Sequence, residues 1–238
     1  MTPQDPMVPK TLIGRDKDTA WMGFLILAGL FIASLVTCNL IFRKFFAWDV
    51  GGMTFEQSVG LLPYPITFLV TDMISEIYGK RKANLVVFSG LAASILTLGI
   101  VTLAGWADAT SWSPVSNAEF DHAFGQTALA VGASMAAYLL AQFIDVRIFH
   151  FWKSLTHGKH LWLRNNLSTI PSQIVDTSTV LVLLCAVGEI GWERFGALLL
   201  NGVAFKSLVA ALDTPLVYLG VGWMRRRFGL LEGQEVAL

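Results

Sequence analysis

The sequence is poor in charge. Only 14% of its 238 residues are charged, whereas an ordinary soluble domain carries about 25%. The 17 basic and 17 acidic residues give a formal net charge of zero, which argues against nucleic acid as a partner. In contrast, 54% of the residues are hydrophobic and the mean hydropathy is positive. The composition therefore indicates an integral membrane protein in contact with the lipid bilayer.

Cysteines and catalytic motifs are also scarce. Cys38 and Cys185 both fall in apolar runs, which disfavours a disulfide framework or a thiolate metal site. The segment His157-Gly-Lys-His160 lacks the glutamate of the zinc motif H-E-x-x-H, and the chain contains no G-x-S-x-G, P-loop or glycine fingerprint. We therefore expect no cofactor, no metal ion and no catalytic residue. A pump driven by ATP would need another chain to hydrolyse the nucleotide.

Six apolar runs are each about long enough to cross a bilayer as a helix. They cover residues 21–42, 57–78, 83–106, 123–149, 167–187 and 195–223. Residues 45–56, between the first two runs, are expected to form a loop with Gly51-Gly52 as its breaker. The predicted organisation is a short, disordered cytoplasmic tail over residues 1–20, a six-helix transmembrane domain over 21–224 and a cytoplasmic tail over 225–238. Pro63 and Pro65 fall in the first turns of the second run, which predicts a broken helix or a re-entrant piece.

The basic residues predict the orientation of the chain. One side of the membrane receives thirteen lysines and arginines, and the other receives Arg43, Lys44 and Arg194. Under the positive-inside rule, both termini are then cytoplasmic. An odd number of spans would destroy this segregation, so the charge pattern favours six independently of the apolar runs.

Polar residues inside the runs are spaced so that they share helix faces. The pairs are Asp72 with Glu76, Gln142 with Asp145, Gln173 with Asp176, and Lys206 with Asp213, while Asn39 lies in the first run. A charge at the centre of a membrane costs about 2.5–3.5 kcal/mol, so aligned stripes of this kind indicate a shared polar interior. The single deep lysine cannot neutralise Asp72, Asp176 and Asp213 together. The surplus acids must be protonated, hydrated or bound to the donors of a ligand.

This inventory suits a flat small molecule that is rich in hydrogen-bonding groups. A carboxylate can accept two bonds from the ring N–H and the exocyclic amine of a purine-like or pteridine-like base, and carboxamides match its other polar atoms. Tyr64, Phe68, Tyr138 and Phe143 could supply a stacking surface. Two other interpretations stay open, namely a proton relay through the acids and purely structural pairing of single residues.

Several longer motifs resemble a known family. They are N-L-I at 39–41, P-Y-P-x-T-F at 63–68, D-x-x-S-E-x-Y-G at 72–79, A-Q-F-I-D-V at 141–146, R-N-N at 164–166 and S-T-I-P-S-Q-x-x-D-T at 168–177. Through these motifs the chain resembles the queuosine precursor transporters, which are also grouped as vitamin uptake transporters. The resemblance extends over nearly the whole chain.

The resemblance implies an all-α importer with six transmembrane helices, similar to the substrate-binding components of energy-coupling-factor transporters but working without the ATPase module. The implied substrate is chiefly 7-cyano-7-deazaguanine, with 7-aminomethyl-7-deazaguanine as a second candidate, for salvage into tRNA queuosine. The substrate-binding residues that it implies are Asn39, Asp72, Glu76, Gln142, Asp145, Asn166, Gln173 and Asp176. Lys206 and Asp213 join this set from their spacing alone.

The site is expected between the second, fourth and fifth helices, with the first and sixth closing it. We expect one carboxylate among Asp72, Asp145 and Asp176 to accept from the guanine-like edge of the ligand, with Gln142 and Gln173 completing the hydrogen bonds. Asp72 is favoured for this contact because it lies deeper, whereas gating or an ion pair suits Glu76 at least as well as ligand contact. The alternatives are a binding component that needs a separate energising complex, an importer of another nucleobase-like or vitamin-like molecule, an intramembrane hydrolase and a structural scaffold. Proton coupling and homo-oligomer formation stay open.

Overall fold

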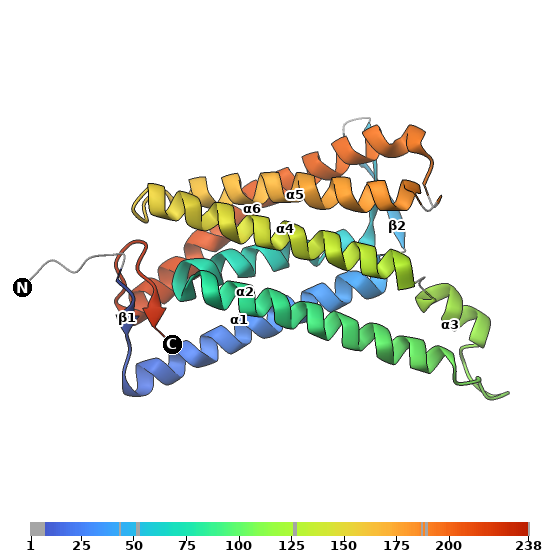
Figure 1. Cartoon of the computed structure of the whole chain (residues 1–238), viewed down its shortest axis with the longest axis horizontal. Helices are drawn as coiled ribbons and strands as arrows, with labels where there is room; N and C mark the ends of the chain where they lie inside the picture. The colour runs from blue at the N-terminus through green and yellow to red at the C-terminus, as the bar shows by residue number, and fades with distance from the viewer. Residues whose placement is uncertain are drawn as a thin grey trace, which may run out of the picture.

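The computed structural model describes residues 8–42, 44–50, 53–125, 128–186, 188 and 190–237. Long helices form a bundle: α1 (Gly14–Ile41), α2 (Tyr64–Gly105), α4 (Ala128–Leu155), α5 (Leu161–Ala186) and α6 (Trp192–Phe228). The short helices are η1 (Val59–Leu61) and α3 (Asn117–Phe124), and the strands are β1 (Lys10–Thr11), β2 (Phe45–Val50), β3 (Met53–Ser58) and β4 (Val236–Ala237). The helices lie roughly alongside one another (Figure 1).

Helix α2 combines two of the predicted spans. Its regular geometry stops at Gly79, where φ is 80° and ψ is 169°. The two halves of α2 run in opposite directions on either side of this residue (Figure 1). Only glycine adopts such a backbone conformation without strain, which explains why the helix reverses there. The described residues therefore contain six long helical segments, two of them from α2.

The prolines at the start of α2 begin the helix and do not interrupt it. Pro63 is the N-terminal cap, and Pro65 lies in the first turn. Backbone N–H groups of the first turn make no hydrogen bond within the helix, so the N–H that proline lacks is not needed there. The preceding segment was expected to be a loop. It is instead an antiparallel hairpin in which Phe45 of β2 pairs with Ser58 of β3.

The two ends of the described chain pack together. Strand β1 pairs in parallel with β4, and Lys10 donates 2.9 Å hydrogen bonds to the carbonyls of Phe228 and Gly229, where α6 ends. Helix α1 already begins at Gly14. The expected disorder is therefore wrong for residues 8–20, because the partners of this segment come from the far end of the chain. Strands β1 and β4, at the two ends of the described chain, lie at the same end of the bundle as the turn in α2 and the α4–α5 connection (Figure 1).

The surface of the bundle is apolar. Within the described residues, four helical segments are long and apolar enough to cross a membrane: Gly14–Ile41, Val59–Gly105, Leu161–Ala186 and Trp192–Phe228. Large side chains such as Leu25 on α1, Leu96 on α2 and Leu219 on α6 are more than half exposed. Apolar surface on this scale is stable in lipid and not in water. The chain is therefore a predominantly helical integral membrane protein.

Candidate binding site between α2, α5 and α6

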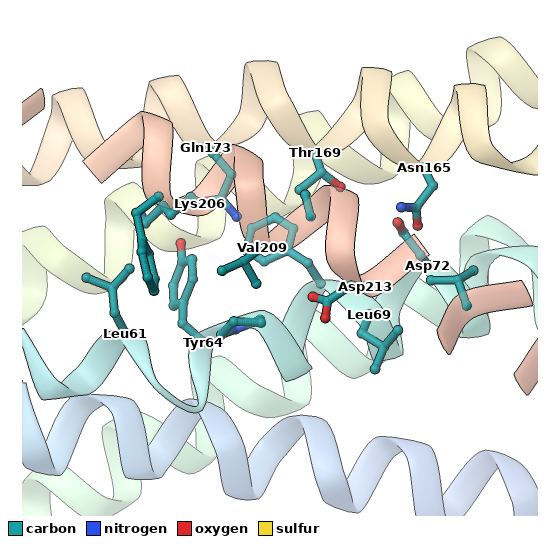
Figure 2. Close-up of a pocket in the computed structure, with 15 residues that line it drawn as sticks. Leu61, Tyr64, Leu69, Asp72, Asn165, Thr169, Gln173, Lys206, Val209 and Asp213 are labelled. Carbon is teal, nitrogen blue, oxygen red and sulfur yellow. The ribbon is translucent and has the colours of Figure 1, made fainter. Parts of the chain in front are cut away.

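A pocket of about 390 Å³, including space open to the surroundings, lies between α2, α5 and α6. Its polar lining consists of Tyr64, Asp72, Asn165, Thr169, Gln173, Lys206 and Asp213, and its apolar lining includes Phe68, Phe205, Val209 and Val217. Figure 2 shows Asp72 and Asn165 toward one end of the pocket, and Tyr64, Gln173 and Lys206 toward the other.

Three buried oxygens of the lining have no hydrogen-bond partner among the described residues. They are Oδ1 of Asp72, Oδ1 of Asn165 and Oε1 of Gln173. The exposed fractions of these residues are 1%, 3% and 3%. A buried polar atom left without a partner costs about 1–3 kcal/mol, so donors from a bound molecule would recover this free energy. The pocket is therefore built to receive several N–H or O–H groups.

Lys206 and Asp176 form an ion pair at the edge of the pocket. The Nζ of Lys206 lies 2.8 Å from Oδ2 of Asp176 and 3.1 Å from the hydroxyl of Thr177. The hydroxyl of Tyr64 donates to the same Asp176 oxygen at 2.5 Å, and the Lys206 ammonium lies 4.4 Å from the centre of the Tyr64 ring. Asp176 thus already accepts two strong bonds. Its role here is to hold Lys206 and Tyr64 in place.

Asp145 and Gln142 form a layer behind the pocket and do not line it. Both are fully buried. Asp145 accepts a 3.2 Å hydrogen bond from Ser172 of α5. Gln142 donates to the hydroxyl of Tyr138 at 2.9 Å. The hydroxyl of Thr71 donates to Oε1 of Gln142 at 3.4 Å, so these contacts link α4 to both α2 and α5.

Glu76 belongs to a separate cluster of charges. Arg164 binds both of its carboxylate oxygens, at 2.6 and 3.1 Å, and Arg225 contacts the same carboxylate. The Nζ of Lys153 lies 3.7 Å from Glu76 and 2.9 Å from Glu235. Four residues along a helix correspond to about 6 Å, so Glu76 lies one turn beyond the pocket, toward Gly79 and the chain termini. We call these five residues the ion cluster.

The two predicted asparagines lie at other helix contacts. Asn39 donates to the hydroxyl of Ser94 at 3.2 Å, between α1 and the second half of α2, beside a smaller pocket of about 320 Å³. Asn166 donates to the hydroxyl of Thr214 at 3.0 Å and so joins α5 to α6. Of the predicted site residues, the structure places Asp72, Gln173, Lys206 and Asp213 in the pocket lining.

Sequence reasoning missed Asn165 and Thr169 as lining residues. Asn165, Thr169 and Gln173 are spaced by four residues and so form one stripe on α5, which faces the pocket. This spacing was available in the sequence, and it selects Asn165 over its neighbour Asn166. The role of Arg164 had no such signal, because its partner Glu76 is 88 residues away.

An apolar-surfaced helical bundle with a polar pocket between its helices is the arrangement expected of a membrane protein that handles a small molecule. Residues 58–220 match the model of a family described as "Putative vitamin uptake transporter". This match covers more than half of the chain, and the chain belongs to this family. The matched range contains α2, α4 and α5 and the whole pocket lining. The resemblance found in the sequence motifs is thereby confirmed.

Two relatives carry more specific names. The chain is 29% identical over 199 residues to the "Probable queuosine precursor transporter" of Bacillus subtilis (strain 168). The aligned region covers 83% of this chain and 80% of the relative. This chain is 26% identical over 128 residues to the "Queuosine precursor transporter" of Escherichia coli (strain K12). Here the aligned region covers 54% of this chain and 55% of the relative. No solved structure matched the chain.

Proposed function

We propose that this protein imports queuosine precursors, chiefly 7-cyano-7-deazaguanine, through the inner membrane of a bacterium. The observation that carries the proposal is the set of buried acceptors without a partner among the described residues, in a pocket between the helices of a chain similar to two proteins named as queuosine precursor transporters. The deazaguanine ring system offers a ring N–H beside an exocyclic amine, and such a donor pair complements a carboxylate.

In the proposed complex, Asp72 accepts from the ring N–H and the exocyclic amine. Asn165 and Gln173 accept or donate at the remaining polar atoms of the ring. The Lys206 ammonium, fixed by Asp176, donates to the ring carbonyl, and the aromatic rings of the lining pack on the faces of the base. Of the three acids considered from the sequence, Asp72 is the one whose free oxygen lines the pocket.

We further propose six membrane spans, formed by α1, the two halves of α2, α4, α5 and α6, with both termini in the cytoplasm. The basic segments at 80–82 and 225–227 support this orientation, because they belong to the turn of α2 and the end of α6, which lie at the same end as strands β1 and β4 (Figure 1). The ion cluster then lies between the pocket and the cytoplasm. The likeness to energy-coupling-factor components stays part of this proposal.

Complementation of cells that cannot make the precursor tests this function. Cells expressing the protein and supplied with 7-cyano-7-deazaguanine should contain queuosine in their tRNA, and cells expressing Asp72→Asn should not. Asp16→Asn, which alters an exposed ion pair with Arg227, serves as the matched control for a lost carboxylate. Membrane levels of the variants are compared by immunoblot. Normal queuosine with Asp72→Asn would refute the role of this residue, and no queuosine with the unaltered protein would refute the function.

A further inference from the structure

Residues 229–237, which we call the C-terminal strap, cross the end of the bundle where the two halves of α2 meet. The strap begins at Gly229, whose φ of 59° ends α6, and it finishes in strand β4, which pairs with β1. Between these points Gly233 packs against Gly158 of the α4–α5 connection. The two backbones are so close that a Cβ on either glycine would lie 2.6–2.7 Å from the Cα of the other. Figure 1 shows the strap in red at this end of the bundle.

The strap has a defined and largely buried position. Gln234 and Val236 are 4% and 3% exposed. The side chain of Gln234 donates a 3.1 Å hydrogen bond to the carbonyl of Val8, and the backbone N–H of Lys10 donates to the carbonyl of Glu235 at 2.7 Å. These bonds hold the strap to the segment that precedes α1. Its hold on the other helices depends on few groups, of which one is charged.

That charged group is Glu235, which joins the strap to the ion cluster. Its carboxylate lies 2.9 Å from Nζ of Lys153 on α4 and borders Gly79 in the turn of α2. The same Nζ donates a 2.9 Å bond to the main-chain carbonyl of Glu76 and lies 3.7 Å from the Glu76 carboxylate. Lys153 therefore connects the strap directly to the acid at the centre of the cluster.

The ion cluster closes the space between the three helices that line the pocket. Glu76 belongs to α2, Arg164 to α5 and Arg225 to α6, and the one carboxylate binds both guanidinium groups. The side chains of Glu76 and Arg164 are fully buried. Of the pocket lining, Asp72 lies one helical turn from Glu76, and Asn165 follows Arg164 in the chain. A molecule in the pocket cannot pass between these helices toward the strap unless the contacts of Glu76 separate.

We propose that the ion cluster and the C-terminal strap form the cytoplasmic gate of the transporter, closed in this structure, and that the strap must leave Gly158 and Lys153 before substrate is released. The inference rests on the proposed function and orientation. Separating buried charges is costly while they remain away from water. Glu235, with a side chain 29% exposed, is the most exposed member of the cluster. Opening therefore begins at the strap, because its departure lets water reach Lys153 and compensate the charges that Glu76 releases.

A reversible cross-link tests the inference. Lys159 and Glu232 are exposed and adjoin the contact between Gly158 and Gly233. The double variant Lys159→Cys, Glu232→Cys can be bridged by a short bis-maleimide that contains a reducible disulfide. The bridged protein should still bind labelled 7-cyano-7-deazaguanine in detergent, but its uptake into liposomes should be lost, and a reductant should restore it. Lys159→Cys alone, treated with the same reagent, is the matched control and should retain uptake.

The outcomes separate the gate from the import function. Unaltered uptake by the bridged protein overturns the gate and leaves import standing. Loss of binding together with uptake also overturns it, because a gate on the exit controls passage and not affinity. No uptake by the unaltered protein refutes the proposed function, and the gate falls with it.

A second variant decides the question if the double variant is unstable. Glu235→Gln removes the charge that holds the strap to Lys153, so hydrogen–deuterium exchange of residues 229–237 should become faster than in the unaltered protein. Asp16→Asn, which alters only an exposed ion pair, should leave this exchange unchanged. Equal exchange in the Glu235→Gln variant and the unaltered protein would overturn the role of Glu235 as the fastening of the gate.

Discussion

Replacing Glu76 by glutamine should destabilise the protein strongly. The Glu76 side chain is fully buried, and it is the acid shared by Arg164, Arg225 and Lys153, whose side chains are 0%, 18% and 3% exposed. Glutamine has nearly the same shape but no charge. The three cations would then share only Glu235, whose side chain is 29% exposed and which pairs with Lys153.

Removing one partner of a buried ion pair costs about 3–5 kcal/mol, because the other charge is left buried without compensation. Arg164 keeps its 2.8 Å bonds to the carbonyls of Gly158 and Lys159, so part of its hydrogen bonding survives. For a chain of this size the loss corresponds to a decrease in melting temperature of roughly 6–20 °C. The measurement is thermal unfolding of the purified protein in detergent.

The control is Asp16→Asn. Asp16 pairs with Arg227 at 2.8 Å, but the side chains are 50% and 38% exposed. Exposed pairs contribute about 0–1 kcal/mol, so this variant should melt close to the unaltered protein. Equal melting temperatures for Glu76→Gln and Asp16→Asn would show that Glu76 is not the shared counter-ion, and the ion cluster would have to be abandoned.

Three further substitutions test the helix turn and the pocket. Gly79→Ala should destabilise the protein by more than about 1 kcal/mol in denaturant titration, because φ is 80° and a Cβ there would lie 2.2 Å from Glu235 Oε2; unchanged stability would contradict the turn. Asn165→Leu should weaken binding of 7-cyano-7-deazaguanine by about tenfold or more in calorimetry, because Asn165 lines the pocket. Asn166→Leu should lower only the melting temperature, because Asn166 joins α5 to α6. The reverse result would show that Asn166, and not Asn165, contacts the ligand. Lys206→Met leaves Asp176 without its cation, so both uptake and melting temperature should fall, and unaltered uptake would argue against a role for Lys206.

The helical bundle could be predicted because each long helix is an apolar run of sufficient length. The aligned spacing of polar residues also identified part of the pocket, since Asp72, Gln173, Lys206 and Asp213 all line it. These features depend on local periodicity, which one sequence carries. Periodicity says which residues share a face of one helix, and nothing about which faces meet.

The ion cluster and the ordered chain ends could not be predicted for this reason. Arg164 lies just before a predicted span, where a basic residue is commonly explained by membrane topology. Only the fold brings it to Glu76, and only the fold places Glu235 beside Gly79 and Lys153. The β2–β3 hairpin was not predicted, because the glycine pair between its strands is as typical of an irregular loop as of a hairpin turn.

The most direct test of the account is binding of 7-cyano-7-deazaguanine to the purified protein, compared with the analogue that lacks only the exocyclic amine. The account has Asp72 accept from the ring N–H and from that amine, so removing the amine leaves a buried carboxylate oxygen without its donor. The prediction is that the deazaguanine binds and that the analogue binds about tenfold more weakly or worse. Equal affinities, or no binding of the deazaguanine, would contradict the proposed site.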